Sequence, residues 1–171
     1  DRILVVNKNG TYYTTDYDLS NHYEEGFSVI EKYEPEKVWS AVFFDAEQQF
    51  YYLKRFRFEN VVRHTLFIGE TEGSYLVALS GEKRPRFEVV FGGRYESRPA
   101  EVIVADEFIA EKSYKARGKR VTTYEVKQIN EIEPLDSGEE ESEDTTSTDI
   151  DFEITNPDML SDEAQMKLDF E

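Results

Sequence analysis

Short runs of β-branched and aromatic residues, separated by turn-forming residues, fill the first 134 positions of the chain. Such runs are typical of β-strands, and helical periodicity is nearly absent apart from a short turn at Ala105–Ala110. The pattern therefore predicts an all-β fold. The expected strands are Ile3–Val6, Thr11–Tyr17, Phe27–Tyr33, Val38–Asp45, Gln49–Phe58, Tyr75–Leu79, Arg86–Phe91, Glu101–Val104 and Arg120–Val126.

Turn residues and side-chain alternation add detail to this pattern. Asn7–Gly10 reads as a hairpin turn because Asn and Gly tolerate positive φ, and Asp45–Gln48 reads as another. In the strand Gln49–Phe58, Phe50, Tyr52, Phe56 and Phe58 share one face, whereas Tyr51, Leu53, Arg55 and Arg57 share the other. We expect one face to pack in a core and the other to meet solvent or a partner.

A partial internal repeat indicates a repeated architecture. Ile3–Val6, with the turn and the Tyr/Thr-rich strand that follow it, resembles Tyr75–Leu79, its Ser80-Gly81 turn and the strand near Phe87, about 72 residues later. Bladed folds and β-sandwiches both produce such repeats, so the repeat leaves both architectures open.

The composition changes at Leu135. Beyond it lie 14 acidic residues and one basic residue, Lys167, which gives that segment a net charge of −13. A segment of this kind buries too little apolar surface to offset its ordering entropy. We therefore expect a folded domain over residues 1–134 and a disordered acidic tail over residues 135–171.

The acidic tail conceals a domain that is close to charge balance. The whole chain carries a net charge of −17, but residues 1–135 hold 19 basic and 23 acidic residues, a net charge of −4. Five cations stand in the nine positions from Lys112 to Arg120, around Gly118. Such a cluster suits a polyanion, because each cation neutralises a phosphate and glycine lets the backbone approach closely. A solvated basic loop that balances nearby acids explains the same residues.

Several kinds of chemistry find no support in the sequence. The absence of Cys excludes disulfides and thiolate metal sites and favours a reducing cytoplasm, and no apolar run reaches membrane-spanning length. His22 and His64 lack the neighbours of a catalytic triad, and Gly92-Gly93 reads as a turn because no helical pattern follows it. We therefore expect no catalytic residue, metal or cofactor here. Because the chain begins at Asp1, we expect it to be a piece of a longer protein.

Five stretches of the sequence form a recognisable set: Leu4–Gly10, Val38–Val42, Asp45–Gln48, Tyr52–Phe56 and Lys115–Arg120. Together they resemble the C-terminal domain of the A subunit of bacterial type IIA topoisomerases. The resemblance is greatest to the topoisomerase IV member of this group in Bacteroides-like bacteria, and it covers most of residues 1–134. It implies a β-pinwheel, here a partial disc of two or three blades, whose basic rim binds and bends duplex DNA.

The resemblance also implies a division of labour within the parent enzyme. The strand-breaking tyrosine and the metal site would lie upstream, so this chain would only guide DNA for ATP-dependent strand passage by the rest of the enzyme. The parent enzyme would use ATP and Mg, and the B subunit would bind to the parent chain. The protein would act in the cytoplasm, at the nucleoid. The segment Lys115–Arg120 resembles a degenerate gyrase box that lacks the Gln and the paired glycines. Plain DNA binding is therefore expected in place of strong chiral wrapping.

The resemblance and the charge pattern together predict which residues bind DNA. We expect phosphate contacts, because no pattern indicates a helix or ribbon that reads base edges. The predicted DNA-binding residues are Lys112, Lys115, Arg117, Lys119 and Arg120, and the predicted supporting contacts are Lys54, Arg55, Arg57, Arg84, Arg86, Arg94 and Arg98.

The end of the tail holds a second candidate site. Residues 165–170 resemble the short peptide by which bacterial replication proteins bind the sliding clamp, with Gln165, Leu168 and Phe170 as anchors. A chance match in six residues, or a strand that docks back on the domain, explains the same pattern.

Two other functions remain open at this level. One is a non-enzymatic, β-rich protein-interaction module whose acidic tail docks on a basic partner. The other is a hydrolase or sugar-binding β-domain, which only aromatic residues such as Trp39 and Tyr51 support.

Overall fold

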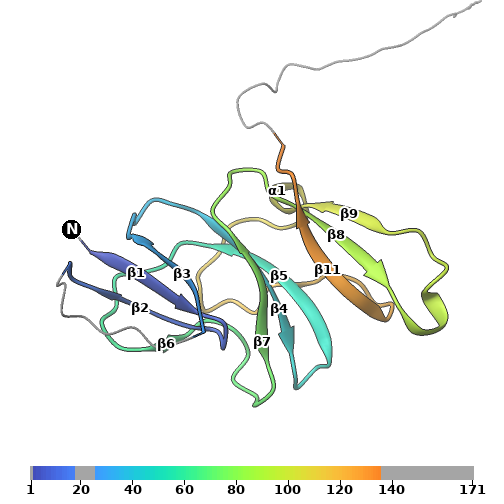
Figure 1. Ribbon diagram of the computed structural model, residues 1–171, viewed down its shortest axis with the longest axis horizontal. Coiled ribbons are helices and arrows are strands. Elements are labelled where there is room, and N and C mark those ends of the chain that lie inside the picture. Colours follow the sequence, from blue (N-terminus) through green and yellow to red (C-terminus); the bar gives the residue numbers. More distant parts are fainter. Residues whose placement is uncertain (1, 18–25, 136–171) are drawn as a thin grey trace, which may run out of the picture. The chain divides into compact units, whose positions relative to one another are not determined.

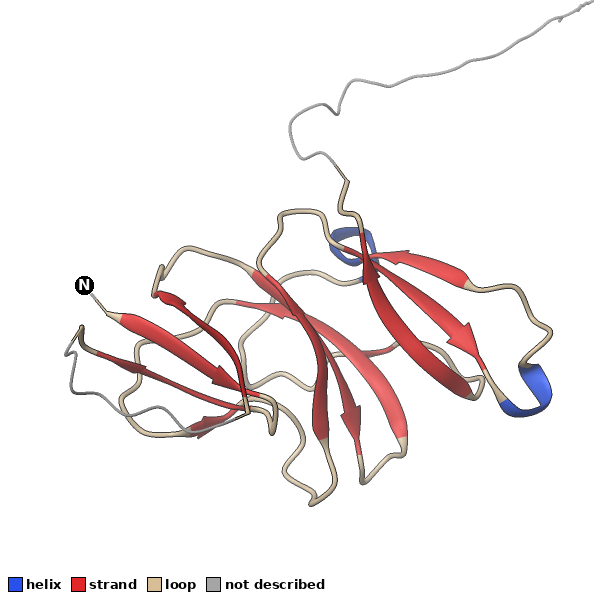
Figure 2. Ribbon diagram, viewed as in Figure 1, coloured by secondary structure: helices blue, strands red, loops and turns tan. Residues whose placement is uncertain are grey.

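The computed structural model describes residues 2–17 and 26–135, and this part of the chain forms three antiparallel β-sheets (Figure 1). Apart from strands, the described residues form one four-residue helix, α1 (Ala105–Phe108), and one 3₁₀ turn at Gly93–Tyr95 (Figure 2). The predicted all-β class and the predicted short helical turn near Ala105 are both confirmed.

Each sheet joins strands that are not all consecutive in the sequence. The first sheet has the order β3-β1-β2-β6, the second has the order β10-β5-β4-β7, and the third has the order β11-β8-β9. The strands of the first sheet are β1 (Ile3–Asn7), β2 (Thr11–Thr15), β3 (Phe27–Lys32) and β6 (Thr65–Leu66). Those of the second are β4 (Trp39–Asp45), β5 (Phe50–Phe56), β7 (Tyr75–Ser80) and β10 (Lys119–Arg120). The third contains β8 (Arg86–Phe91), β9 (Glu101–Val104) and β11 (Val126–Ile132).

The first two sheets share one topology. In the first, β1 lies between β2 and β3, and β6 pairs with β2. In the second, β4 lies between β5 and β7, and β10 pairs with β5. In the sequence, β6 of the first sheet comes after β4 and β5 of the second sheet. In the same way, β10 of the second sheet comes after β8 and β9 of the third sheet. Neighbouring sheets are therefore interlocked by the path of the chain.

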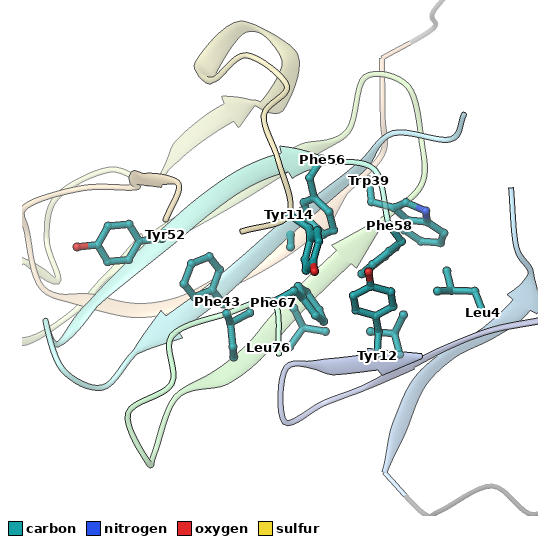
Figure 3. Close-up of a cluster of buried hydrophobic side chains, with 13 residues drawn as sticks. Leu4, Tyr12, Trp39, Phe43, Tyr52, Phe56, Phe58, Phe67, Leu76 and Tyr114 are labelled. Carbon is teal, nitrogen blue, oxygen red and sulfur yellow. The ribbon is translucent and has the colours of Figure 1, made fainter. Parts of the chain in front are cut away.

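Two hydrophobic cores separate the sheets. The first core joins side chains such as Leu4 and Tyr12 of the first sheet to Trp39 and Phe56 of the second (Figure 3). The second core joins the second sheet to the third and contains Leu53, together with Val42, Phe87, Val89, Phe91, Ile103, Ala105, Val121 and Ile129. The second sheet is thus covered on both faces, and Figure 1 shows it between the other two.

This arrangement corrects two expectations. The face of β5 that carries Leu53 is not a solvent-facing surface throughout, because the third sheet packs on it and leaves Leu53 0% exposed, whereas Arg57, just after β5, is exposed. Trp39 is only 4% exposed and belongs to the first core, so it is not available as a sugar-stacking surface.

Most predicted strands agree with the structure, and β9 has the predicted bounds. The predicted strand Arg120–Val126 is wrong, because β10 ends at Arg120 and β11 begins only at Val126. Between them Val121 enters the second core, and the Thr122 hydroxyl accepts the Tyr124 N–H at 3.2 Å. A local side-chain turn of this kind interrupts a strand. The two-residue strand β6 was not predicted.

The proposed internal repeat is also wrong in detail. Strands β1 and β2 form a hairpin within one sheet, whereas β7 and β8 belong to different sheets. The hairpin turn at Asn7–Gly10 is confirmed: Gly10 has φ +90° and donates its N–H to the Asn7 carbonyl at 3.0 Å. The turn at Asp45–Gln48 likewise connects β4 to β5.

Candidate nucleic-acid interface

The segment Lys112–Arg120, here called the basic segment, crosses the edge of the second sheet. Its first residue donates its N–H to the Arg55 carbonyl of β5 at 2.8 Å. The chain then leaves β5 and returns as β10, and Val121 donates its N–H to the Tyr51 carbonyl at 2.8 Å. Both ends of the basic segment are therefore anchored on the same strand, and between them Tyr114 is buried in the first core while the cationic side chains are exposed.

All five predicted cationic side chains of the basic segment are exposed. Within the described ranges, none of them forms an ion pair with a carboxylate. The Lys119 ammonium lies 4.3 Å from the centre of the Phe108 ring, and the Arg120 guanidinium lies 3.9 Å from that of Phe50. Stacking on a ring orients a cation without neutralising it, so these charges remain available to an anion.

Gly118 has a different role from the one expected. Its φ is +96°, and a Cβ at this position would stand 2.9 Å from the Leu53 carbonyl oxygen and 3.1 Å from the Lys54 Cβ. The close approach that glycine permits is therefore to strand β5 and not to a polyanion. Gly118 holds the basic segment against the sheet.

Lys54 is not a surface contact. It is 2% exposed, and its ammonium donates to the carbonyls of Phe67, Tyr114 (2.6 Å) and Ala116 (3.0 Å). Burial lowers the pKa of Lys54 to about 8. Lys54 thus leaves the set of predicted DNA-binding residues, because its ammonium fastens the basic segment from inside.

Several of the supporting arginines are engaged within the protein. Arg57 pairs with Glu36 and Glu111, Arg84 pairs with Asp106 and Glu107, and Arg98 pairs with Glu101, all at 2.7–3.2 Å. Ion pairs at the surface compensate much of the field that a phosphate would feel. These three arginines are therefore weaker candidates than the basic segment.

Of the remaining three arginines, Arg55 lies on β5 next to the basic segment but is partly buried, and Arg86 and Arg94 belong to β8 and to the 3₁₀ turn after it. Arg55 donates to the Ile109 carbonyl at 3.1 Å, and Arg86 of the third sheet donates to the Glu133 carbonyl at 2.7 Å. Arg94 is exposed within the 3₁₀ turn, with its guanidinium 5.3 Å from the centre of the Tyr95 ring. The structure gathers only the predicted residues of positions 112–120 into one uninterrupted, unpaired cluster.

A shallow groove of about 340 Å³ runs beside the basic segment. Lys115 and Arg117 of the basic segment line it together with Leu66 and Phe67, and Glu47 and Glu70 also reach it. No sequence pattern indicated this neighbour, because residues 66 and 115 are brought together only by the interlocked sheets. The burial of Lys54, in contrast, had one signal in the sequence. Alternation along the strand places Lys54 on the same face as Phe56.

The predicted tail and the predicted peptide within it are not described by the structure. Gln165, Leu168 and Phe170, and the whole predicted tail beyond Leu135, lie outside the described residues. Within residues 2–17 and 26–135, no helix is long and apolar enough to cross a membrane, and no three His, Asp or Glu residues gather as a metal site.

Comparison with known proteins identifies the domain. A family model described as the topoisomerase C-terminal domain of Bacteroidota matches residues 1–133. The chain belongs to this family. The match ends one residue after β11, so this topoisomerase C-terminal domain comprises all three sheets, and the predicted resemblance to a bacterial topoisomerase C-terminal domain is confirmed. A search of curated proteins found no match.

Proposed function

We propose that this topoisomerase C-terminal domain binds duplex DNA through the basic segment and guides it for strand passage by the rest of its enzyme. The observation that carries the proposal is the state of Lys112, Lys115, Arg117, Lys119 and Arg120. All five are exposed and unpaired among the described residues of a chain whose net charge is −17. Such a cluster does not increase the solubility of an acidic protein. Binding of the cluster to a phosphate backbone, in contrast, is favoured by the release of counterions.

The contacts in this proposal go to phosphates. The basic segment is a loop ending in the two-residue strand β10, so it offers neither a helix nor a long ribbon to the major groove. Flexible Lys and Arg side chains on such a loop position DNA without reading its sequence. Any preference among duplexes then follows how easily each of them bends.

The enzyme around this domain is also part of the proposal. The three antiparallel sheets, two of them with one shared topology, are consistent with the blades of a pinwheel. We assign the domain to the A subunit of an ATP-dependent type IIA topoisomerase of the topoisomerase IV kind. Strand cleavage, ATP and Mg, and the contact with the B subunit would then belong to the rest of the parent enzyme.

The salt dependence of DNA affinity tests the proposal. In the full chain, alanine replaces Lys115, Arg117, Lys119 and Arg120 together, and binding to a labelled duplex is followed by fluorescence anisotropy. If each residue meets one phosphate, the slope of log affinity against log salt falls by roughly 3 to 4, at about 0.9 per contact. The loss is alike for unrelated duplex sequences, because phosphates carry no base information.

A matched control removes the same charge elsewhere. Lys8, Lys32, Lys83 and Lys127 are exposed and have no ion pair within the described residues, and they are scattered along the chain. Their joint replacement by alanine leaves the slope near the wild-type value. Equal losses in the two quadruple variants would mean that net charge alone governs binding, and an unchanged basic-segment variant would place any DNA site elsewhere.

A further inference from the structure

A second segment crosses a sheet edge in the same way as the basic segment. Val61–Phe67, here called the first crossing segment, runs along the edge of β2. The Thr14 N–H donates to the Val61 carbonyl at 2.6 Å, the Phe67 N–H donates to the Gly10 carbonyl at 2.9 Å, and β6 pairs with β2 between these bonds. The basic segment does the same on β5. The two segments are therefore structural equivalents on neighbouring sheets.

The two crossing segments also lie against each other. The buried Lys54 ammonium donates to the Phe67 carbonyl of the first crossing segment and to the Tyr114 and Ala116 carbonyls of the basic segment. One cation therefore joins both segments directly. Leu66 and Arg117 both line the same shallow groove.

Arg63 is the cation of the first crossing segment. It is exposed, and it forms no ion pair with any residue in the described ranges. Its backbone is fixed, because its carbonyl accepts the Thr65 hydroxyl at 2.8 Å. The next side chain, His64, stacks on Tyr13 with the ring centres 4.4 Å apart. Arg63 thus extends from an ordered turn two residues before β6, which is the place that Arg117 holds before β10.

We propose that Arg63 is a second phosphate contact for the same duplex that the basic segment binds. This inference rests on the proposed function and adds a residue from the first sheet to it. Glu47 and Glu70 line the groove between the segments and repel phosphates from it. The DNA backbone is therefore held by the basic segment and by Arg63 at the equivalent place on the neighbouring sheet, which sets the direction of the duplex across the first and second sheets.

The test uses Arg63→Ala in the full chain with the same anisotropy titration. Loss of one phosphate contact lowers the salt slope by roughly 0.9 and weakens binding about eightfold at 0.1 M salt. Arg63→Lys keeps the slope, because lysine also neutralises a phosphate. Lys32→Ala, which removes an exposed cation of the same sheet at the end of β3, leaves slope and affinity at wild-type values.

The outcomes separate this inference from the proposed function. A wild-type slope in Arg63→Ala, with a reduced slope in the quadruple basic-segment variant, rejects the second contact and leaves the proposed function standing. A wild-type slope in both rejects the proposed function. Weaker binding with an unchanged slope in Arg63→Ala also rejects the inference, because Arg63 would then act on the shape of its segment and not on a phosphate.

Discussion

Lys54 shows how a charged residue is accommodated in the interior of this domain. Its side chain lies 5.3–5.8 Å from the ring centres of Phe43, Phe56 and Phe67, and no carboxylate pairs with it among the described residues. Burying an ammonium costs free energy unless its protons are hydrogen-bonded. Three carbonyl acceptors match the three protons of the ammonium, so the same contacts that offset its burial hold the two crossing segments in place.

We expect Lys54 to make the stability of the domain rise between about pH 8 and pH 10. Burial lowers its folded pKa to about 8, below the unfolded value near 10.4. In that window the unfolded chain binds a proton that the folded chain lacks, so raising the pH favours folding by up to about 1.4 kcal/mol per pH unit. Urea unfolding followed by the fluorescence of Trp39, the single tryptophan, measures the effect.

Lys54→Met is the control for this pH dependence. The variant loses the rise while other titrating groups act as before, so the difference between the two pH profiles isolates Lys54. A wild-type domain whose stability has no rise relative to Lys54→Met between pH 8 and pH 10 would contradict the lowered pKa.

Gly118→Ala should destabilise the domain more than Gly26→Ala. Both glycines have positive φ, +96° and +87°, where a side chain costs about 1–2 kcal/mol. A Cβ at Gly118 also meets the Leu53 carbonyl oxygen at 2.9 Å, whereas a Cβ at Gly26 meets nothing within 4 Å. Unfolding free energies from urea titrations compare them, and equal losses would show that the basic segment shifts away from β5 at no cost.

Among the elements, the crossing segments explain why very short strands suffice in this fold. Strands β6 and β10 have two residues each, yet each belongs to a segment bonded to its sheet edge at both ends. Directly after these strands, Phe67 enters the first core and Val121 enters the second. Core packing therefore anchors the crossing segments, and their exposed middle parts are free to carry charge.

Amide hydrogen exchange should distinguish the anchors of the basic segment from its middle. The Lys112 and Val121 N–H groups donate to β5 and should exchange slowly, because their exchange requires the edge to open. The Arg117 N–H has no acceptor within the described part of the chain and should exchange at least about tenfold faster. Fast exchange at Val121 would show that the segment is not fastened to the sheet edge.

Across the molecule as a whole, charge is distributed unevenly along the chain. Residues 1–135 carry a net charge of −4, whereas residues 136–171 carry −13. Both hydrophobic cores consist of residues from positions 4–129. The segment whose charge most opposes binding to DNA, residues 136–171, is therefore distinct in the sequence from the residues that build the sheets.

Truncation after Leu135 should consequently tighten DNA binding. Removing a net charge of −13 weakens the repulsion between the protein and DNA, and the gain is greatest at low salt, where screening is weakest. Anisotropy titrations at low and high salt compare the truncated and full chains. The basic-segment alanine variant in the truncated chain shows whether the gain depends on the same cations, and an unchanged affinity at low salt would contradict the prediction.

Features that depend on side-chain type and near neighbours could be predicted from the sequence. Runs of β-branched and aromatic residues predicted most strands, Asn and Gly at positions 7–10 predicted a hairpin turn, and five closely spaced cations predicted an exposed basic surface. Three-dimensional packing was needed to show that β5 is buried on both faces, that Lys54 points inward, and that the segment carrying Arg63 lies beside the basic segment. These features arise because strands about 53 to 68 residues apart pair across interlocked sheets, and such pairing depends on how whole faces pack and not on local pattern.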